Sequence, residues 1–307
     1  MTTMENSISI IIASSGRVEK IRRLLDSLCR VHGRAQIRHD IVIANNATNE
    51  VVAASVKALT EEYDGRDGVR CWQVPEPIAG KCRAQNKTIP LTAGNLIALM
   101  DDDVEVLPEW LAAIDSFFKH KPHDVMQGAI LMRPEDQQKT DLLAALYRYR
   151  TMDFVNYGAP AGADLKTLTG GNMAVRREVF DATGLFDERL GPGGHGISED
   201  VEFAKRVLQA GKRIGWEPKA AVYNELDPAR LCEEEFRRRH EAQGRSRLAY
   251  KNSSYFSIVP NILRSICRFG WYSIFGNVRK KYRAKGRYYH YRAMLDEKAK
   301  TKSGIQA

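Results

Sequence analysis

The sequence predicts an α/β fold in which helices flank a doubly wound, mainly parallel sheet. Apolar runs of strand length alternate with helical patterns between residues 8 and 100. The first run, residues 8–13, is almost continuously apolar, which is typical of a strand buried on both faces of a parallel sheet. Hydrophobic residues make up 43% of the 307-residue chain, enough for a sizeable core. A regular alternation of this kind indicates a sheet covered by helices on both sides.

The first elements follow in chain order. Strands are predicted at residues 8–13, 40–44, 69–74 and 96–100, with helices between them over residues 18–28, 49–63 and 80–93. Ligands in doubly wound sheets bind beyond the carboxyl ends of the strands. We therefore expect one binding edge, formed by the loops at residues 13–17, 45–48, 75–82 and 101–105.

Beyond residue 105 the pattern is less regular. A helix is predicted within residues 106–120, starting near Pro108. After it we expect a strand over 125–132, a partly helical segment over 138–157, a loop over 158–162, a strand over 168–175, a loop over 189–197 and a helix over 199–210. The strand at 168–175 contains Gly170, Gly171 and Asn172. Glycines inside a strand often mark the close approach of a ligand or another backbone.

Charge and cysteine content limit the class of protein. The formal net charge is +9, and residues 251–307 hold 13 basic and 2 acidic groups, so the rest of the chain is near neutral. The sequence has no apolar run of about 18 residues and no signal-peptide pattern at its start. None of the five cysteines forms a C-x-x-C pair. Reduced thiols in a cytoplasmic protein are therefore favoured over a zinc site or a disulfide framework.

Asp101, Asp102 and Asp103 directly follow the predicted strand at residues 96–100. Three adjacent carboxylates repel one another unless a cation or solvent compensates. Residues i and i+2 of an extended segment point the same way, so Asp101 and Asp103 can meet one ion. Oxygen ligands favour Mg²⁺ or Mn²⁺. The alternative is a solvated acidic turn before the next helix.

A second acidic site, Ser198-Glu199-Asp200, follows a glycine-rich loop and opens the helix at residues 199–210. Serine and aspartate are good N-caps, and early acids suit the helix dipole, so a purely structural role is one explanation. The functional explanation is a carboxylate that acts as general base toward a hydroxyl.

These two sites, in this order, resemble the family-two glycosyltransferases of the GT-A fold, which has a Rossmann-like sheet flanked by helices. The likeness covers about residues 7–225. It extends over Ser14-Ser15-Gly16-Arg17, residues 41–47, residues 80–86, residues 98–103 with Pro108-Glu109-Trp110-Leu111, Gly170-Gly171-Asn172-Met173-Ala174, residues 184–190 and residues 198–203. Each segment alone is a weak signal, but all of them in sequence order make a strong one.

The resemblance implies roles for the matching positions. Asp101 and Asp103 look like the ends of a metal-binding Asp-x-Asp motif for Mn²⁺ or Mg²⁺, and Asp200 looks like the catalytic base of an inverting enzyme. Donor binding is implied for Ala13, Ser14, Arg17, Asn45, Lys81, Arg83, Asp101, Asp102, Gly171, Asn172 and Glu199. Gly171 and Asn172 would line the sugar or acceptor pocket. The implied substrates are a nucleotide sugar, with UDP favoured, and a carbohydrate or glycolipid acceptor in polysaccharide or glycoconjugate synthesis.

The chain departs from the family pattern at two places. The second strand of such enzymes usually ends in Asp-Asn, whereas here it ends in Asn45-Asn46. An amide can still accept and donate hydrogen bonds to a base. Many relatives carry a histidine after the strand near residue 220, where this chain has Tyr223-Asn224. Asparagine is a poorer transition-metal ligand than imidazole, so the metal is expected to depend more on Asp103, the diphosphate and water.

The predicted domains are a catalytic domain over residues 1–228 and a helical extension over 229–307. The catalytic domain divides into a nucleotide-binding half, about 1–105, and an acceptor-side half, about 106–228. In the extension, basic residues alternate with aromatic ones. This composition suits packing on the catalytic body, or contact of residues 253–292 with an anionic membrane at the inner face of the cell membrane, more than nucleic acid.

Two other classes compete with the transferase. A sugar-phosphate nucleotidyltransferase also uses an α/β sheet and a metal, but it normally has a longer glycine-rich phosphate loop than residues 14–17 provide. A non-catalytic nucleotide- or nucleic-acid-binding protein would bind through the basic extension with a steep salt dependence. The nucleotidyltransferase would also leave the Glu199-Asp200 pair unexplained.

Overall fold

The computed structural model describes residues 6–32, 37–194, 196–251 and 253–302. The chain forms two compact units. The first unit contains the chain up to Arg133 together with Phe154–Glu188 and Glu199–Glu225, and the second contains Pro134–Asp153, Arg189–Ser198 and the chain from Leu226. The second unit thus includes two segments that lie within the predicted catalytic domain. Residues 1–5 and 303–307 of the predicted domains, and residue 195 of the predicted loop, lie outside the described residues.

Four parallel strands form the first part of the sheet. They are β1 (Ser7–Ser14), β2 (Arg38–Asn45), β3 (Arg70–Pro75) and β4 (Leu96–Asp101), in the order β3-β2-β1-β4. This confirms the predicted parallel strands and their helical crossovers.

The sheet continues beyond β4 with mixed pairing. The order from β4 is β8 (Asn172–Arg176), β6 (Val125–Met132), β9 (Ile214–Asn224) and β5 (Val104–Val106), and β7 (Asp164–Leu165) pairs with β9. Strand β8 is antiparallel to both β4 and β6. The strand predicted at residues 168–175 begins only at Asn172, because Gly171 has a φ of 96°, which an extended strand does not contain.

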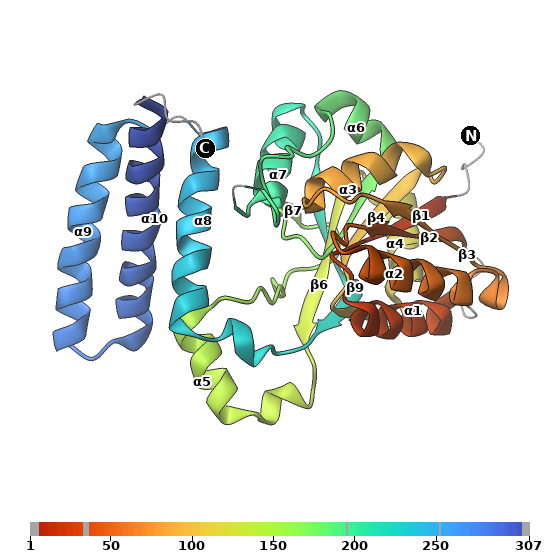
Figure 1. Ribbon diagram of the computed structural model, residues 1–307, viewed down its shortest axis with the longest axis horizontal. Helices are drawn as coiled ribbons and strands as arrows, with labels where there is room; N and C mark the ends of the chain where they lie inside the picture. The colour runs from red at the N-terminus through yellow and green to blue at the C-terminus, as the bar shows by residue number, and fades with distance from the viewer. Residues whose placement is uncertain (1–5, 33–36, 195, 252, 303–307) are drawn as a thin grey trace. The chain divides into compact units, whose positions relative to one another are not determined.

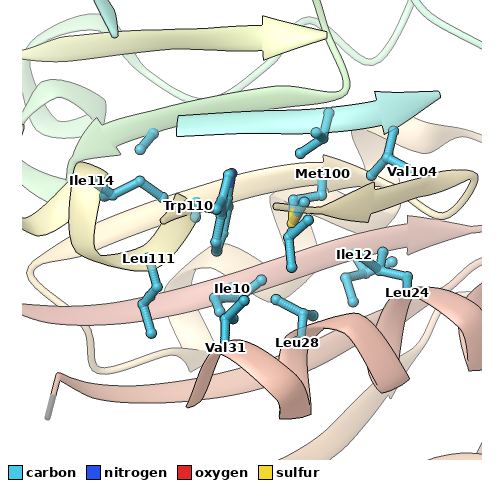
Figure 2. Packing of buried hydrophobic residues seen from close by; sticks show 14 of the residues in the cluster. Ile10, Ile12, Leu24, Leu28, Val31, Met100, Val104, Trp110, Leu111 and Ile114 are labelled. Atoms are coloured by element: carbon cyan, nitrogen blue, oxygen red, sulfur yellow. The ribbon is translucent and has the colours of Figure 1, made fainter. Parts of the chain in front are cut away.

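Helices cover both faces of the sheet in the first unit. Side chains of α1 (Val18–His32), α2 (Glu50–Tyr63) and α4 (Trp110–His120) pack in one hydrophobic core with Ile10 and Ile12 of β1. Side chains of α3 (Lys81–Thr88), α6 (Arg177–Thr183) and α7 (Glu199–Gln209) pack in a second core with Ile11. Figure 2 shows Ile10 and Ile12 among the side chains of the first core, including Leu24 and Leu28. Ile10 and Ile12 enter one core and Ile11 the other because successive side chains of a strand point to opposite faces of the sheet.

Pro90 accounts for one helix that is shorter than predicted. The helix expected at residues 80–93 ends at Thr88, and a short 3₁₀ turn, Ile89–Leu91, follows with Pro90 inside it. Proline lacks the amide hydrogen that a helix interior requires, so it ends this helix. The helix that was expected to start near Pro108 begins at Trp110, in agreement with the preference for proline at helix starts.

The second unit is helical. It contains α5 (Thr140–Tyr149), α8 (Glu233–Tyr250), α9 (Tyr255–Ile274) and α10 (Val278–Lys302). Helix α10 packs against both α8 and α9 and lies between them (Figure 1). Gly244 and Gly286 allow α8 and α10 to approach closely, because a Cβ atom at either would come within 2.2 Å of the opposite helix. In the described residues, none of the helices is long and apolar enough to cross a membrane.

Candidate active site

The carboxyl ends of β1, β2 and β4 meet at one edge of the sheet. The strand register places Ala13 beside Asp101 and Ser14 beside Asn45. Parallel strands that end at the same level bring their following loops together, so the edge expected from the sequence is present. Asp101 is the last residue of β4, and its side chain is 36% exposed.

Asp102 is buried and stabilises the loop that follows β1. It accepts hydrogen bonds from the Ser14 hydroxyl and from the guanidinium of Arg17, which also reaches Asp103 at 2.9 Å. Burial raises the pKa of Asp102 to about 6, although Arg17 and Ser14 favour its charged form. The side chains of Ser14, Arg17 and Asp102, which the resemblance assigned to the donor, are therefore bonded to one another in this structure.

Asn45 and Asn46 also turn inward. The Asn45 amide donates to the carbonyl of Ala53 and to Gln73 Oε1, at 3.1 and 2.9 Å, and the residue is 2% exposed. The Asn45 side chain thus holds its own chain in this structure, and its contact with the base stays a prediction. Asn46 donates to two carbonyls of the loop after β3 and accepts from Gly80 N, each within 2.8 Å. The two amides hold the loop that leads into Lys81.

Lys81 joins the two acidic sites that the sequence separates. Its Nζ lies 2.6 Å from Asp101 Oδ1 and 3.4 Å from Glu199 Oε1. Burial by itself would lower the pKa of Lys81, but the charges of Asp101 and Glu199 outweigh it and raise the pKa above its ordinary value. The lysine therefore stays charged and offsets the repulsion between the carboxylates.

Gly170 and Gly171 lie between the same groups. A Cβ atom at Gly171 would come 2.9 Å from Asp101 Oδ2, and one at Gly170 would come 3.4 Å from Lys81 Nζ and 3.7 Å from Asp200 Oδ2. The Gly170 amide donates a 2.6 Å hydrogen bond to Asp200. The two glycines therefore allow Asp101 and Asp200 to face a common site, which explains the glycines noted in the sequence.

Asp200 has the properties of a base that works near neutral pH. Burial and the charge of Glu199 raise its pKa to about 7, while the amides of Gly170 and Val201 and the charge of Lys81 lower it. The Val201 amide donates to Oδ1 at 2.7 Å, so both carboxylate oxygens have a fixed orientation. A carboxylate of this pKa accepts a proton more readily than a solvated aspartate does.

Asn172 lies inside the protein, and its contact with the sugar or acceptor stays a prediction. It is fully buried, donates to the carbonyls of Ala129 and Ala220 at 2.8 Å, and accepts from Trp110 Nε1 at 2.9 Å. These bonds tie β8 to β6, β9 and α4. Asn172 therefore positions the Gly170–Gly171 turn.

Tyr157 was not identified from the sequence. Burial and the charge of Asp200 raise the pKa of Tyr157, whereas the Thr169 side chain lowers it. The ring is 44% exposed and packs edge-on against Trp216, with ring centroids 4.9 Å apart. An aromatic residue beside the glycine-rich stretch at 158–162 was the available signal, and periodicity does not detect it.

Arg83 lies apart from the carboxylates in this structure. It pairs with Glu188 at 3.2 Å, and both side chains are about 40% exposed. Lys81 therefore has closer contact with the acidic site than Arg83, although the sequence analysis gave both the same role.

The residues around Asp103 suit a hard divalent cation in part. No group of three or more acidic, histidine or cysteine side chains that could hold a metal occurs in the described residues. Asn224 of β9 pairs with Val104, the residue after Asp103, and its buried Oδ1 has no hydrogen-bond partner among the described residues. Asp101, Asp103 and this amide oxygen are oxygen donors of the kind that Mg²⁺ and Mn²⁺ prefer. Water or a diphosphate would have to complete the shell.

The chain is similar in sequence to known glycosyltransferases. A family model described as "Glycosyltransferase like family 2" matches residues 6–246. The chain is 23% identical over 203 residues to a beta-monoglucosyldiacylglycerol synthase of Trichormus variabilis, covering 65% of this chain and 41% of that protein. It is 25% identical over 227 residues to the probable glycosyltransferase YdaM of Bacillus subtilis, covering 72% and 51%. The chain thus spans about half the length of these relatives or less.

Solved structures share the fold. One is the mannosyltransferase PcManGT from Pyrobaculum calidifontis in complex with GDP-Man and Mn²⁺, with a TM-score of 0.57, 14% identity and coverage of 99% of this chain and 77% of that one. Another is S. aureus TarS 1-349 in complex with UDP-GlcNAc, with a TM-score of 0.53, 13% identity and coverage of 97% and 92%. At these identities the likeness shows the fold.

Proposed function

The chain belongs to the glycosyltransferase-like family 2, and from that premise we propose that it is an inverting enzyme that moves a sugar from a UDP-sugar to an acceptor hydroxyl. The observation that supports this most is the convergence of Asp101, Lys81 and Asp200 around Gly170 and Gly171. On one side of that site the Asp101 carboxylate lies beside the Lys81 ammonium, an arrangement that suits a diphosphate with its metal ion. The other presents a base with a raised pKa.

In this proposal Asp200 accepts the proton of the acceptor hydroxyl. The hydroxyl oxygen attacks the anomeric carbon from the face opposite the diphosphate, the bond from that carbon to the diphosphate oxygen breaks, and its electron pair leaves with the nucleotide. A single displacement inverts the anomeric configuration. The amides of Gly170 and Val201 orient the Asp200 carboxylate before the reaction, which lowers the cost of reaching the reactive geometry.

The charge of the departing diphosphate has to be neutralised. Asp101 and Asp103 would hold a divalent cation, with Mn²⁺ or Mg²⁺ fitting their oxygen ligands and Asn224 Oδ1 adjacent. The cation would supply Lewis-acid stabilisation of the leaving group. Lys81, already beside Asp101, supplies a second positive charge from the chain itself.

The acceptor is proposed to be a carbohydrate or a glycolipid in polysaccharide or glycoconjugate synthesis. The half-exposed ring of Tyr157, next to Thr169 and within the field of Asp200, offers a flat apolar surface on which a sugar ring can lie. Tyr157→Ala should then raise the acceptor KM while leaving the donor KM unchanged, and Tyr157→Phe should retain most of the effect of the ring. Equal changes in both KM values would contradict this assignment.

We further propose a cytoplasmic enzyme that acts at the inner face of the membrane. All five cysteines are free, as expected of a protein in a reducing compartment. Family membership favours the transferase over the nucleotidyltransferase and binding-protein alternatives.

The experiment that tests the proposed function is thermal unfolding with UDP, GDP and CDP, each with and without Mn²⁺. A ligand at about 100 times its Kd stabilises the folded state by about 2.7 kcal/mol, so a donor nucleotide gives a measurable shift. We expect UDP to raise the Tm, and more so with Mn²⁺. The variant Asp101→Asn/Asp103→Asn should lose the Mn²⁺-dependent part. A larger shift with GDP or CDP would reassign the donor, and no shift with any nucleotide would overturn the proposal.

A further inference from the structure

Helix α9 carries an apolar surface that the other described residues of its unit leave exposed. We call it the α9 apolar face, and it consists of Phe256, Val259, Leu263, Ile266, Trp271 and Ile274, all exposed. Phe256 is 93% exposed, Ile274 79% and Trp271 60%. Their steps of three to five residues along a helix of 3.6 residues per turn place them on one side.

The opposite side of α9 is the one that packs. Ile258 and Ser265 are buried, and α9 contacts α10 along its length. Within this unit α9 is the outer helix of the row α8, α10, α9 (Figure 1). Folding of the unit therefore buries one side of α9 and exposes the other. Contiguous exposed apolar patches on soluble proteins mark surfaces for a partner or a membrane.

The charges on α9 and in the first turn of α10 have one sign. Arg264 and Arg268 lie on α9 beside the apolar residues, and Arg279 and Lys280 follow in the first turn of α10; all four are exposed. The sequence has no aspartate or glutamate between residues 251 and 295. The surface is thus apolar at its centre and basic at its edge. A partner that fits both parts is apolar inside and anionic outside.

We propose that the α9 apolar face lies in the headgroup region of an anionic lipid bilayer, with the helix axis parallel to the membrane. Arg264, Arg268 and the helix-internal Pro260 interrupt the apolar sequence, and α9 does not qualify as a membrane-spanning helix. An amphipathic helix with phenylalanine, tryptophan and leucine on one side and arginine beside them binds at the interface. The basic residues add attraction to anionic lipid.

Other partners fit this surface less well. Two copies that paired through the α9 apolar face would bring Arg264 and Arg268 of each near those of the other, and like charges repel. Nucleic acid suits basic and aromatic residues, but Val259, Leu263 and Ile266 offer it neither hydrogen bonds nor stacking. A bilayer satisfies both the apolar and the basic residues.

Tryptophan fluorescence of the full chain with vesicles tests the proposal directly. The chain has four tryptophans. Trp110 and Trp216 are buried and Trp72 is half-buried, so Trp271 is the exposed one. Vesicles that contain phosphatidylglycerol should shift the tryptophan emission to the blue, and brominated lipid should quench it. The variant Trp271→Phe should lose both signals, although the protein should still bind the vesicles. Absence of the shift together with absence of co-flotation would overturn the proposal.

Matched variants separate the apolar from the electrostatic contribution. Ile274→Asp should reduce co-flotation at least tenfold, whereas Val51→Asp on α2, a residue 75% exposed and distant in sequence, should leave it unchanged. Arg264→Gln and Arg268→Gln should each lower binding to anionic vesicles by about fivefold at low salt. Equal losses for Ile274→Asp and Val51→Asp would contradict the assignment of the face.

If the proposal fails, two further measurements identify which other partner covers the α9 apolar face. Light scattering after size exclusion should show a monomer that is unchanged by Ile274→Asp; a dimer that this variant dissociates would assign the face to a second copy. A mobility shift with single-stranded RNA that Ile274→Asp weakens would assign it to nucleic acid. Vesicle binding is read without turnover, so its failure is distinguishable from failure of the proposed transferase activity.

Discussion

The Nζ of Lys81, at the start of α3, lies 2.6 Å from Oδ1 of Asp101, at the end of β4. The same ammonium reaches Glu199 at 3.4 Å, next to Asp200 at the start of α7. One lysine therefore connects the proposed metal and donor side of the site to the proposed base. Its charge stabilises three carboxylates that would otherwise repel one another.

Lys81 should set the pH at which Asp200 loses its proton. Its positive charge lowers the pKa of Asp200. Lys81→Met removes this charge, so the Asp200 pKa should rise and the rising limb of kcat/KM should move to higher pH. Lys81→Arg keeps the charge and is the matched control. A pH profile that is the same for Lys81→Met and the unmodified protein would show that the lysine has no influence on the base.

Turnover should depend on the ionised form of Asp200. Burial raises its pKa to about 7, so the carboxyl is protonated below that pH and cannot accept a proton. We expect kcat/KM to rise as pH increases through about 7. Asp200→Asn should lower kcat by about 10² to 10⁴ while donor affinity, measured by calorimetry, changes little. Loss of donor binding in this variant would move Asp200 to the donor or metal site.

Gly171 should be required for catalysis rather than for folding. Gly171→Ala places a Cβ atom 2.9 Å from Asp101 Oδ2 and should displace that carboxylate. Gly211→Ala is a matched control, because Gly211 also has a positive φ but no atom lies within 4 Å of the added Cβ. Both variants should lose about 1 kcal/mol of stability in urea. Only Gly171→Ala should lose activity by tenfold or more, and equal activities would contradict this role.

Asn224 should influence metal affinity. Its buried Oδ1 lacks a hydrogen-bond partner among the described residues and lies on β9 beside the residue that follows Asp103. Asn224→His provides an imidazole, which binds Mn²⁺ and Zn²⁺ better than an amide does. We expect tighter Mn²⁺ binding by electron paramagnetic resonance in this variant and weaker binding in Asn224→Ala. Unchanged affinity in both would separate Asn224 from the metal.

The helical unit should lose stability in mild acid. Burial lowers the pKa of His240 and of His290 to about 4 from the ordinary value of 6.5. The unfolded chain therefore binds protons that the folded unit does not. The stability is fully present above about pH 6.5 and falls as the pH approaches 4, by up to about 3 kcal/mol for each imidazole. Urea unfolding followed by circular dichroism at several pH values measures this slope.

The contributions of the two histidines can be separated from general acid sensitivity. His240→Gln and His290→Gln should each flatten the dependence of unfolding free energy on pH. His120→Gln changes an exposed histidine on α4 and should leave the dependence as it is. The same slope in all three variants would mean that other groups cause the acid sensitivity.

The sequence by itself was sufficient to predict the parallel strands and to locate the motifs that follow them. Mostly apolar runs such as residues 8–13, in which Ser9 is the polar exception, predict buried strands because a strand covered on both faces needs apolar residues at most positions. The prediction was less accurate at two places: Pro90 ended one helix early, and the φ of Gly171 delayed the start of β8. These are local effects of backbone geometry that periodicity does not register.

Only the tertiary structure decided what the side chains contact. Asp102, Asn45 and Asn172 have residue types suited to a ligand, but each is buried and bonded to its own chain. The link from Lys81 to both acidic sites depends on residues about 20 and 118 positions away along the chain being neighbours in space. The sequence specifies which side chains carry charge and can form hydrogen bonds. Their burial and the distances between them arise only when distant segments pack, and these decide whether a group binds a ligand or stabilises the fold.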